Sequence, residues 1–155
     1  MIVVSTGAAL RVELAYRRSK KETIALVPTM GNLHAGHMRL VQEARKRANT
    51  VVASIYVNPL QFGPTEDYDQ YPRTLDKDRG VLERAGVDVL FTPNDDEMYP
   101  RGREAQTRVE VPGVSDILCG AFRPGHFRGV TTVVARLFNL AAPDIAVFGK
   151  KDYQQ

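Results

Sequence analysis

The sequence predicts an α/β protein built on a doubly wound, Rossmann-like parallel sheet. Short apolar runs at 25–29, 50–57 and 87–91 alternate with segments of helical periodicity, which is the pattern of βαβ units. The run at 50–57 is almost continuously apolar and β-branched, as expected of a strand that is covered on both faces. With 155 residues, 43% of them hydrophobic and 25% charged, the chain has the size and composition of one globular domain.

The first half of the chain supplies the first strands and helices of this sheet. Residues 1–4 form a short strand, and a helix follows over 6–21, where basic residues complement the helix C-terminus. The apolar run at 25–29 ends at a Pro-Thr turn. After a loop, apolar residues recur at helical spacing over 41–48, so this second helix can pack one face on the sheet.

The second half continues the alternation after a long interruption. Turn-forming residues begin at Asn58, and the chain stays irregular through Arg73. Doubly wound folds place substrates at such loops, which follow the carboxyl ends of strands. A turn or short helix is expected at 94–100. The remaining helices are expected at 74–86 and 126–141, and the remaining strands at 87–91, 106–111 and 144–148.

The strongest candidate site is the loop between the strand at 25–29 and the helix that follows it. Two glycines, Gly31 and Gly36, allow close approach of the backbone, and His34 and His37 stand at the predicted helix N-terminus. Unpaired amide groups and the helix dipole attract phosphate there, and neutral imidazoles can donate hydrogen bonds to it. An anionic ligand is therefore expected. The dipole also favours neutral histidines.

Two other interpretations of these histidines remain open at this point. A histidine near a helix start often serves as a cap or as an ordinary surface residue. A zinc site would need more ligands, whereas the chain contains only 3 histidines and 1 cysteine and no HExxH arrangement. No metal-ligating residue is predicted.

Composition narrows the classes of partner. The apolar runs are far shorter than the ~20 residues that cross a bilayer, and no signal pattern opens the chain, so we expect a cytoplasmic protein without membrane contact. The net charge of +3 comes from scattered basic residues, which suits a small anionic substrate. No RRM, KH or zinc-finger pattern supports nucleic-acid binding, although a basic interaction domain using 17–21 and 39–47 is a possible alternative. Cys119 is expected to be a packed small residue.

Several stretches carry a resemblance to known families. His34-Ala35-Gly36-His37 resembles the H-x-G-H signature of the HIGH-motif nucleotidyltransferase superfamily, in which paired histidines contact the phosphates of ATP. Together with the flanking stretches, the whole chain resembles the pantothenate synthetase, or pantoate–β-alanine ligase, family. The stretches that carry this resemblance are 27–37, 57–62, 71–74, 123–130 and 148–155.

The resemblance implies an AMP-forming ligation in two steps. Pantoate and ATP would give pantoyl adenylate and pyrophosphate with the help of Mg²⁺, and β-alanine would then attack to give pantothenate and AMP. His37 would be the proton donor, with His34 beside it on the phosphates, and these two are the predicted catalytic residues. The predicted ATP-binding residues are Met30, Gly31, Asn32, Leu33, His34, Ala35, Gly36, His37, Gly149, Lys150, Lys151 and Asp152.

The same resemblance assigns the acid-binding side of the site. Gln61 and Gln155 would hold pantoate and β-alanine, because an amide can donate to a carboxylate and accept from a hydroxyl. Lys150 stands where relatives often carry Glu, which makes its turn more cationic. Arg123 and His126 are expected to support the pocket and Tyr71 and Arg73 to shape the substrate loop, with a purely structural role as the alternative for each.

The resemblance also bears on the extent of the domain. Residues 1–155 are expected to be a single domain that is truncated, because Gln155 lies just inside a helix that follows a strand. Relatives continue into a counterpart of the K-M-S-K-S loop and a lid domain, so slow or no turnover is expected of this chain. A homodimer through this domain is expected from the family. The nearest alternative is a related enzyme that transfers AMP to a phosphorylated vitamin.

Overall fold

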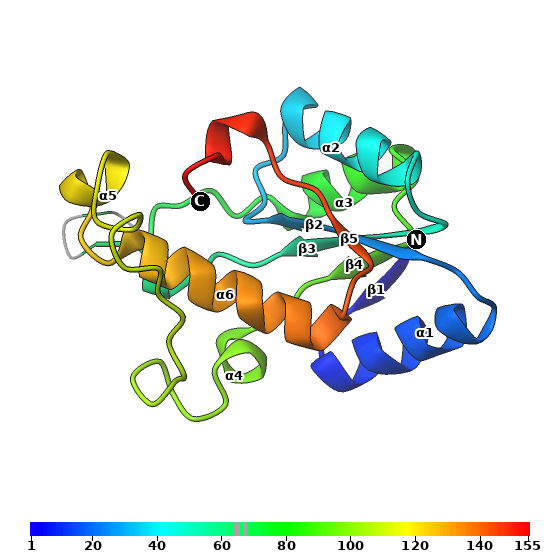
Figure 1. Cartoon of the computed structure of the whole chain (residues 1–155). Coiled ribbons are helices and arrows are strands. Elements are labelled where there is room, and N and C mark those ends of the chain that lie inside the picture. Colours follow the sequence, from blue (N-terminus) through cyan, green and yellow to red (C-terminus); the bar gives the residue numbers. More distant parts are fainter. Residues whose placement is uncertain (64–65, 67) are drawn as a thin grey trace.

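Within residues 1–63, 66 and 68–155, which the computed structural model describes, five parallel strands form one sheet (Figure 1). Their order is β1-β4-β3-β2-β5, and every neighbouring pair is parallel. The strands are β1 (Ile2–Val4), β2 (Ile24–Thr29), β3 (Thr50–Ile55), β4 (Val89–Phe91) and β5 (Ile145–Ala146). The predicted α/β architecture is confirmed.

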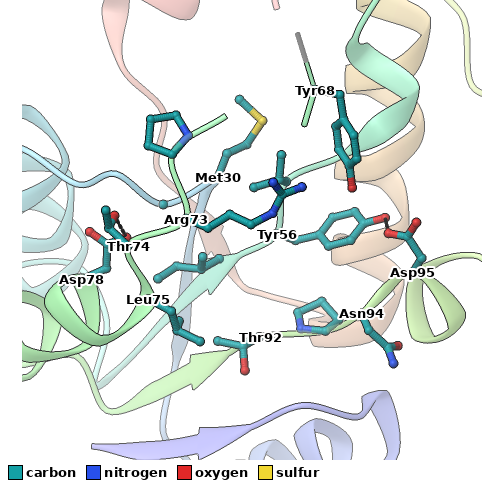
Figure 2. Close-up of a pocket in the computed structure, with 15 residues that line it drawn as sticks. Met30, Tyr56, Tyr68, Arg73, Thr74, Leu75, Asp78, Thr92, Asn94 and Asp95 are labelled. Carbon is teal, nitrogen blue, oxygen red and sulfur yellow. Dashed lines mark hydrogen bonds between the residues drawn. The ribbon is translucent and has the colours of Figure 1, made fainter. Parts of the chain in front are cut away.

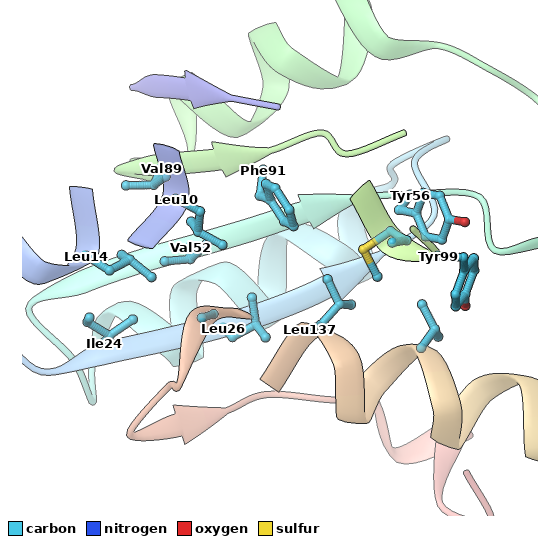
Figure 3. Packing of buried hydrophobic residues seen from close by; sticks show 13 residues of the cluster. Leu10, Leu14, Ile24, Leu26, Val52, Tyr56, Val89, Phe91, Tyr99 and Leu137 are labelled. Atoms are coloured by element: carbon cyan, nitrogen blue, oxygen red, sulfur yellow. The ribbon is translucent and has the colours of Figure 1, made fainter. Parts of the chain in front are cut away.

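Helices cover both faces of the sheet, as the doubly wound prediction requires (Figure 1). One face is covered by α1 (Gly7–Ser19) and α6 (His126–Ala141), and the other by α2 (Ala35–Arg45) and α3 (Leu75–Arg84). Figure 3 shows the first of the two cores, where Leu10, Leu14 and Leu137 pack against strand residues. On the opposite face, Val41 and Leu82 close the second core.

Local sequence explains why two of these helices form where they do. The Thr6 hydroxyl caps α1 by accepting the N–H of Ala9 at 3.1 Å. In α6, periodic burial outweighs the poor helix propensity of its β-branched residues, because Val130, Val133 and Leu137 all face the interior. The helical prediction for 126–141 is therefore confirmed by packing rather than by propensity.

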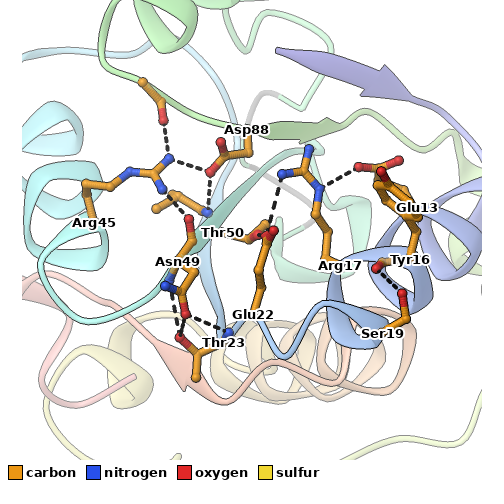
Figure 4. Close-up of polar contacts among 12 residues, drawn as sticks. Glu13, Tyr16, Arg17, Ser19, Glu22, Thr23, Arg45, Asn49, Thr50 and Asp88 are labelled. Carbon is orange, nitrogen blue, oxygen red and sulfur yellow. Dashed lines mark hydrogen bonds and ion pairs between the residues drawn. The ribbon is translucent and has the colours of Figure 1, made fainter.

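A polar network ties the amino ends of the strands together, far from the candidate site (Figure 4). Arg45 of α2 pairs with Asp88, and the same carboxylate accepts the N–H of Val51 at 2.8 Å. Beside it, the Asn49 side chain accepts the N–H of Thr23 at 3.0 Å. These contacts fix the start of three neighbouring strands, so their side chains have a structural role.

The predicted strand at 106–111 is wrong. Val109 is instead held by α6, since its N–H donates to Thr132 Oγ1 at 3.0 Å and its carbonyl accepts from the Thr131 hydroxyl at 2.5 Å. The backbone of this segment is therefore paired with threonine hydroxyls of α6 rather than with a neighbouring strand, and the side chains of Val109 and Val111 stay exposed. The strand expected at 144–148 shortens to Ile145–Ala146.

Three short helices lie between the longer elements. The segment expected at 94–100 contains α4 (Asp95–Met98), and the long loop begins with the 3₁₀ turn η1 (Pro59–Gln61). Pro64, Thr65 and Asp67 of that loop lie outside the described residues. Cys119 is exposed at the start of α5 (Cys119–Phe122), so the expectation that it is packed is wrong. Among the described residues, no helix is both long and apolar enough to span a membrane.

Candidate active site

A cavity of about 320 Å³ opens at the carboxyl ends of β2 and β5. In the sheet, β2 lies between β3, which follows it in the sequence, and β5, which is the last strand. The order of the strands therefore reverses at β2, and the loops after β2 and β5 run in different directions. Ligands of doubly wound folds bind at such a switch point because loops splay apart there and leave a crevice. The cavity is therefore where topology alone predicts a site.

The two histidines of the candidate loop build the start of α2. His34 is the N-cap, and its Nδ1 accepts the N–H of Gly36 at 3.0 Å. In return, Nδ1 of His37 accepts the N–H of His34 at 3.3 Å. The ring centroids lie 4.2 Å apart. The capping interpretation and the site interpretation are therefore compatible, because both rings cap the helix and both line the cavity.

This reciprocal cap decides which imidazole nitrogen carries the proton. Because each Nδ1 accepts a hydrogen bond, the network assigns the proton of each neutral ring to Nε2. Burial lowers the pKa of His37 below its ordinary value of 6.5, and the neighbouring His34 and Lys151 act in the same direction. His37 thus offers a neutral Nε2–H donor. The expected neutral state is supported for His37, with burial rather than the helix dipole as the leading cause.

Gly36 is required by the position of the His34 ring. A Cβ at residue 36 would lie 2.8 Å from His34 Cε1 and 3.0 Å from Nδ1. Gly31 is needed for a different reason, since its φ of +83° lies in the left-handed region. The next residue, Asn32, also has a positive φ of 51°. The loop therefore turns sharply before the helix begins.

Gln61, on the turn η1, lines the same cavity and contacts the histidine loop at Met30. Its Nε2 donates to Met30 Sδ at 3.0 Å, and its Oε1 accepts from Asn58 Nδ2 at 3.1 Å. Asn58 is only 1% exposed and also receives the Tyr99 hydroxyl at 2.7 Å. This chain fixes the orientation of the Gln61 amide before any ligand binds.

The backbone of the same turn is held by a second polar chain. Arg123 makes two bonds to Glu66, at 2.6 and 2.8 Å, and these lower the pKa of the Glu66 carboxyl to about 2. Its remaining nitrogen lies 3.0 Å from His126 Nε2, which must accept because arginine only donates. Nδ1–H of His126 then donates to the carbonyl of Gln61 at 2.8 Å. Arg123 and His126 therefore support the site without lining its cavity.

Helix α6 forms an apolar wall opposite the polar groups. Val130, Val133, Val134 and Leu137 line the cavity together with Phe148. Gly129 permits this contact, because a Cβ there would lie 2.1 Å from the carbonyl oxygen of Leu60. The cavity thus joins an apolar surface to hydrogen-bonding groups, which suits a small ligand with both characters.

The turn after β5 closes the remaining side with a cation and a carboxylate. Lys151 and Asp152 line the cavity, and Lys151 Nζ lies 2.6 Å from Asp152 Oδ1. Gly149 and Lys150 lie instead on an adjoining hollow formed with α6. Gln155 lines both, while Gln154 is occupied in binding the carbonyls of Val114 and Ile117.

The structure brings most of the predicted residues to one place. From the predicted set, the residues on the cavity wall are Met30, Gly31, Asn32, His34, His37, Gln61, Lys151, Asp152 and Gln155. The side chain of Leu33 is 8% exposed and packs in the core with Val41. Ala35 and Gly36 belong to the first turn of α2 and do not line the cavity.

Sequence reasoning missed two polar residues that hold this site in place: Asn58, which lines the cavity, and Asp78, which binds the loop from outside it. Asn58 could be seen only as part of an Asn-Pro turn, and Asp78 resembled an ordinary acid in the first turn of a helix. Both are buried, at 1% exposure each. Within the described residues, no group of three or more histidine, cysteine or acidic side chains could hold a metal ion.

Comparison with known proteins identifies the family. Residues 2–155 match the family model described as pantoate-beta-alanine ligase. Curated relatives named pantothenate synthetase include those of Shewanella halifaxensis, 59% identical over 155 residues, and Azotobacter vinelandii, 62% identical over 155 residues. Each match covers 100% of this chain and 55% of the relative, so the chain spans about half the length of these relatives.

Solved structures agree with the family match. A crystal structure of pantothenate synthetase from Thermus thermophilus matches with a TM-score of 0.91 and 55% identity, covering 99% of this chain and 54% of that one. A pantoate-beta-alanine ligase from Francisella tularensis, complexed with beta-gamma ATP and beta-alanine, matches with a TM-score of 0.90 and 40% identity. This second match covers 100% of this chain and 59% of the other.

Proposed function

The chain belongs to the pantoate–β-alanine ligase family, and on that premise we propose that residues 1–155 form the nucleotide- and pantoate-binding domain of an ATP-dependent acid–amine ligase. The proposed reaction condenses (R)-pantoate with β-alanine to give pantothenate, AMP and pyrophosphate. One observation carries this proposal: paired Nε2–H donors, a prepositioned glutamine and an apolar wall surround a single cavity at the switch point.

In the proposed first step, the carboxylate of pantoate attacks the α-phosphorus of ATP, and pyrophosphate leaves. Negative charge grows on the phosphate oxygens as the P–O bond breaks. His34 and His37 offer Nε2–H groups to these oxygens, and Lys151 adds a cation on the same wall. Donors aimed at developing charge stabilise a transition state by roughly 3 kcal/mol each in comparable sites.

The amide and the apolar wall are proposed to hold pantoate. Gln61 Nε2–H can donate to its carboxylate or hydroxyl, and Gln155 lines the same cavity. The methyl groups of pantoate would lie against Val133, Val134 and Leu137. In the second step, the amine of β-alanine attacks the acyl carbon of the adenylate, AMP leaves, and the amine loses a proton.

Mg²⁺ is proposed to act on the ATP phosphates rather than through a dedicated protein cage. It often keeps several waters and binds by one or two carboxylates plus substrate phosphates, which fits a cavity whose wall carries the Asp152 carboxylate beside Lys151. When bound, the ion would neutralise charge on the phosphate oxygens. The side chains of this wall would orient those oxygens.

Two further proposals concern the 155-residue polypeptide itself. Its turnover is proposed to be slow or absent, since His34, Lys151 and Gln155 are exposed on the open side of the cavity. A homodimer is proposed from the family resemblance, and the exposed apolar residues Ile117, Leu118 and Phe122 support self-association. Sedimentation velocity over a range of concentrations tests the second proposal.

Calorimetric titration with Mg-ATP and with pantoate tests the proposed function. We expect both ligands to bind, His37→Ala to weaken ATP binding, and Gln61→Ala to weaken pantoate binding. Gln70→Ala, on an exposed position of the same loop, is a matched control for the glutamine variant. Absence of binding by the folded chain would contradict the proposal. Binding of phosphopantetheine in place of pantoate would favour the AMP-transferring alternative.

A further inference from the structure

The buried carboxylate of Asp78 binds the candidate loop from outside its cavity. Asp78 lies in the first turn of α3 and is 1% exposed. Its Oδ2 accepts the N–H of Asn32 and its Oδ1 the N–H of Leu33, each at 2.9 Å. Two consecutive amide groups of the loop therefore share one carboxylate.

The same carboxylate connects the loop to the segment that precedes α3. The Thr74 hydroxyl donates to Asp78 Oδ2 at 2.9 Å, and Figure 2 draws this bond at the edge of a second cavity. That cavity, of about 450 Å³, shares Met30 and Gly31 with the candidate site. Asp78 thus lines the second cavity, whereas the two histidines line the candidate site.

The loop needs such an external anchor because its backbone is locally unfavourable. Gly31 and Asn32 both have positive φ, at 83° and 51°, a region that glycine adopts freely and that asparagine tolerates better than other side chains, although it still disfavours them. A Cβ at Gly31 would lie 3.0 Å from Asp78 Oδ2, so the carboxylate fills the space that glycine leaves. The Asp78 carboxylate therefore packs directly against the turn that it holds.

Hydrogen bonds, rather than an ion pair, compensate the charge of Asp78. Among the described residues, no Lys, Arg or His nitrogen forms a salt bridge with it. Its three donors and the positive end of the α3 dipole supply the compensation. Burying a carboxylate is costly unless its oxygens accept hydrogen bonds. An apolar residue would therefore serve better at this position if packing were its only role.

We propose that Asp78 is a positioning residue for ATP, because it fixes Asn32 and Leu33 and thereby places His34 and His37 on the cavity wall. The proposal rests on the proposed function. The pantoate side is held mainly by other residues: Asn58 binds the Gln61 side chain and His126 its carbonyl, while the one contact of Gln61 with the loop is to Met30, which precedes the two anchored amides. Loss of the anchor is therefore expected to affect one ligand and not the other.

The test compares Asp78→Asn and Asp78→Ala with Asp76→Asn in the 155-residue chain. Asp76 lies in the same first turn but is exposed, so this control removes the same charge. Two quantities are measured below the unfolding transition: amide hydrogen exchange of Asn32 and Leu33, and calorimetric affinity for Mg-ATP and for pantoate. Asp78→Asn keeps the volume and one acceptor, so it is the variant expected to stay folded.

We expect exchange at Asn32 and Leu33 to quicken and ATP affinity to fall by about tenfold or more in the Asp78 variants, with pantoate affinity within about twofold. The Asp76 control should match the unmutated chain. Unchanged exchange, or equal losses for ATP and pantoate, would overturn the anchoring role. If the unmutated chain binds neither ligand, the proposed function fails, whereas the exchange data still decide whether Asp78 holds the loop.

Discussion

The imidazoles of His34 and His37 cap the same helix reciprocally, with Nδ1 of each ring accepting a backbone N–H of the first turn. A cap of this kind usually uses a hydroxyl or carboxylate oxygen. Imidazole performs the same task with one nitrogen and leaves the other free. Here the structural role of Nδ1 fixes the direction of Nε2–H.

Replacing Gly36 by alanine should separate helix stability from ligand binding. The new Cβ displaces the His34 ring, so a cap worth about 1 kcal/mol is lost, while alanine regains about 1 kcal/mol of helix propensity. We expect the free energy of unfolding to change by less than about 1 kcal/mol and ATP affinity to fall about tenfold. Denaturant unfolding and calorimetry measure the two. Unchanged ATP affinity would show that the position of the His34 ring is unimportant.

The lowered pKa of His37 predicts a pH dependence of stability. Because the folded-state pKa lies below the unfolded value of 6.5, the unfolded chain binds the proton more readily. Stability from this residue is therefore complete above pH 6.5 and falls as the pH drops from there through the folded-state pKa. His37→Gln should flatten the unfolding free energy in this window, as measured by urea unfolding at several pH values. An equally steep dependence in the variant would assign the effect to other groups.

Gly129 should be among the least tolerant positions of α6. Alanine there would drive a methyl group into the Leu60 carbonyl and separate η1 from the helix, at a cost of about 3 kcal/mol. Gly80→Ala is the matched control, because its Cβ meets only the end of Arg84 at 3.4 Å and should stabilise α3 by roughly 0.5–1 kcal/mol. Thermal unfolding of both variants distinguishes the contact from a general effect of adding a methyl group.

Asn58→Ala should damage the pantoate side of the cavity. The variant leaves the buried Tyr99 hydroxyl and the Gly129 carbonyl without their partner and frees the Gln61 amide. We expect a loss of about 2–3 kcal/mol in unfolding free energy and roughly tenfold weaker pantoate binding, with ATP affinity changed by less than about twofold. Equal weakening of both ligands would indicate a general collapse of the cavity instead.

Most of the fold and of the loop that carries the site follow from the sequence alone. Apolar runs and helical periodicity predict the strands at 25–29 and 50–57 and the helix between them, because burial patterns are local properties of the chain. The motif from Met30 to His37 is likewise visible as a glycine-rich turn before a helix. The failure at 106–111 marks the limit of this approach, since alternation does not reveal whether a neighbouring strand will pair with the segment, and here Val109 and Val111 stay exposed.

Only the tertiary structure determined which side chains hold the loop and the turn in place. Asp78 follows Asn32 by 46 residues, and Asn58 meets Gly129 across 71 residues, separations over which no sequence pattern specifies a partner. The doubly wound sheet brings these segments together at one end, where a buried carboxylate and a buried amide satisfy backbone groups that the loops leave unpaired. Local periodicity determined the elements, whereas the need to pair every buried polar group determined how they assemble around the cavity.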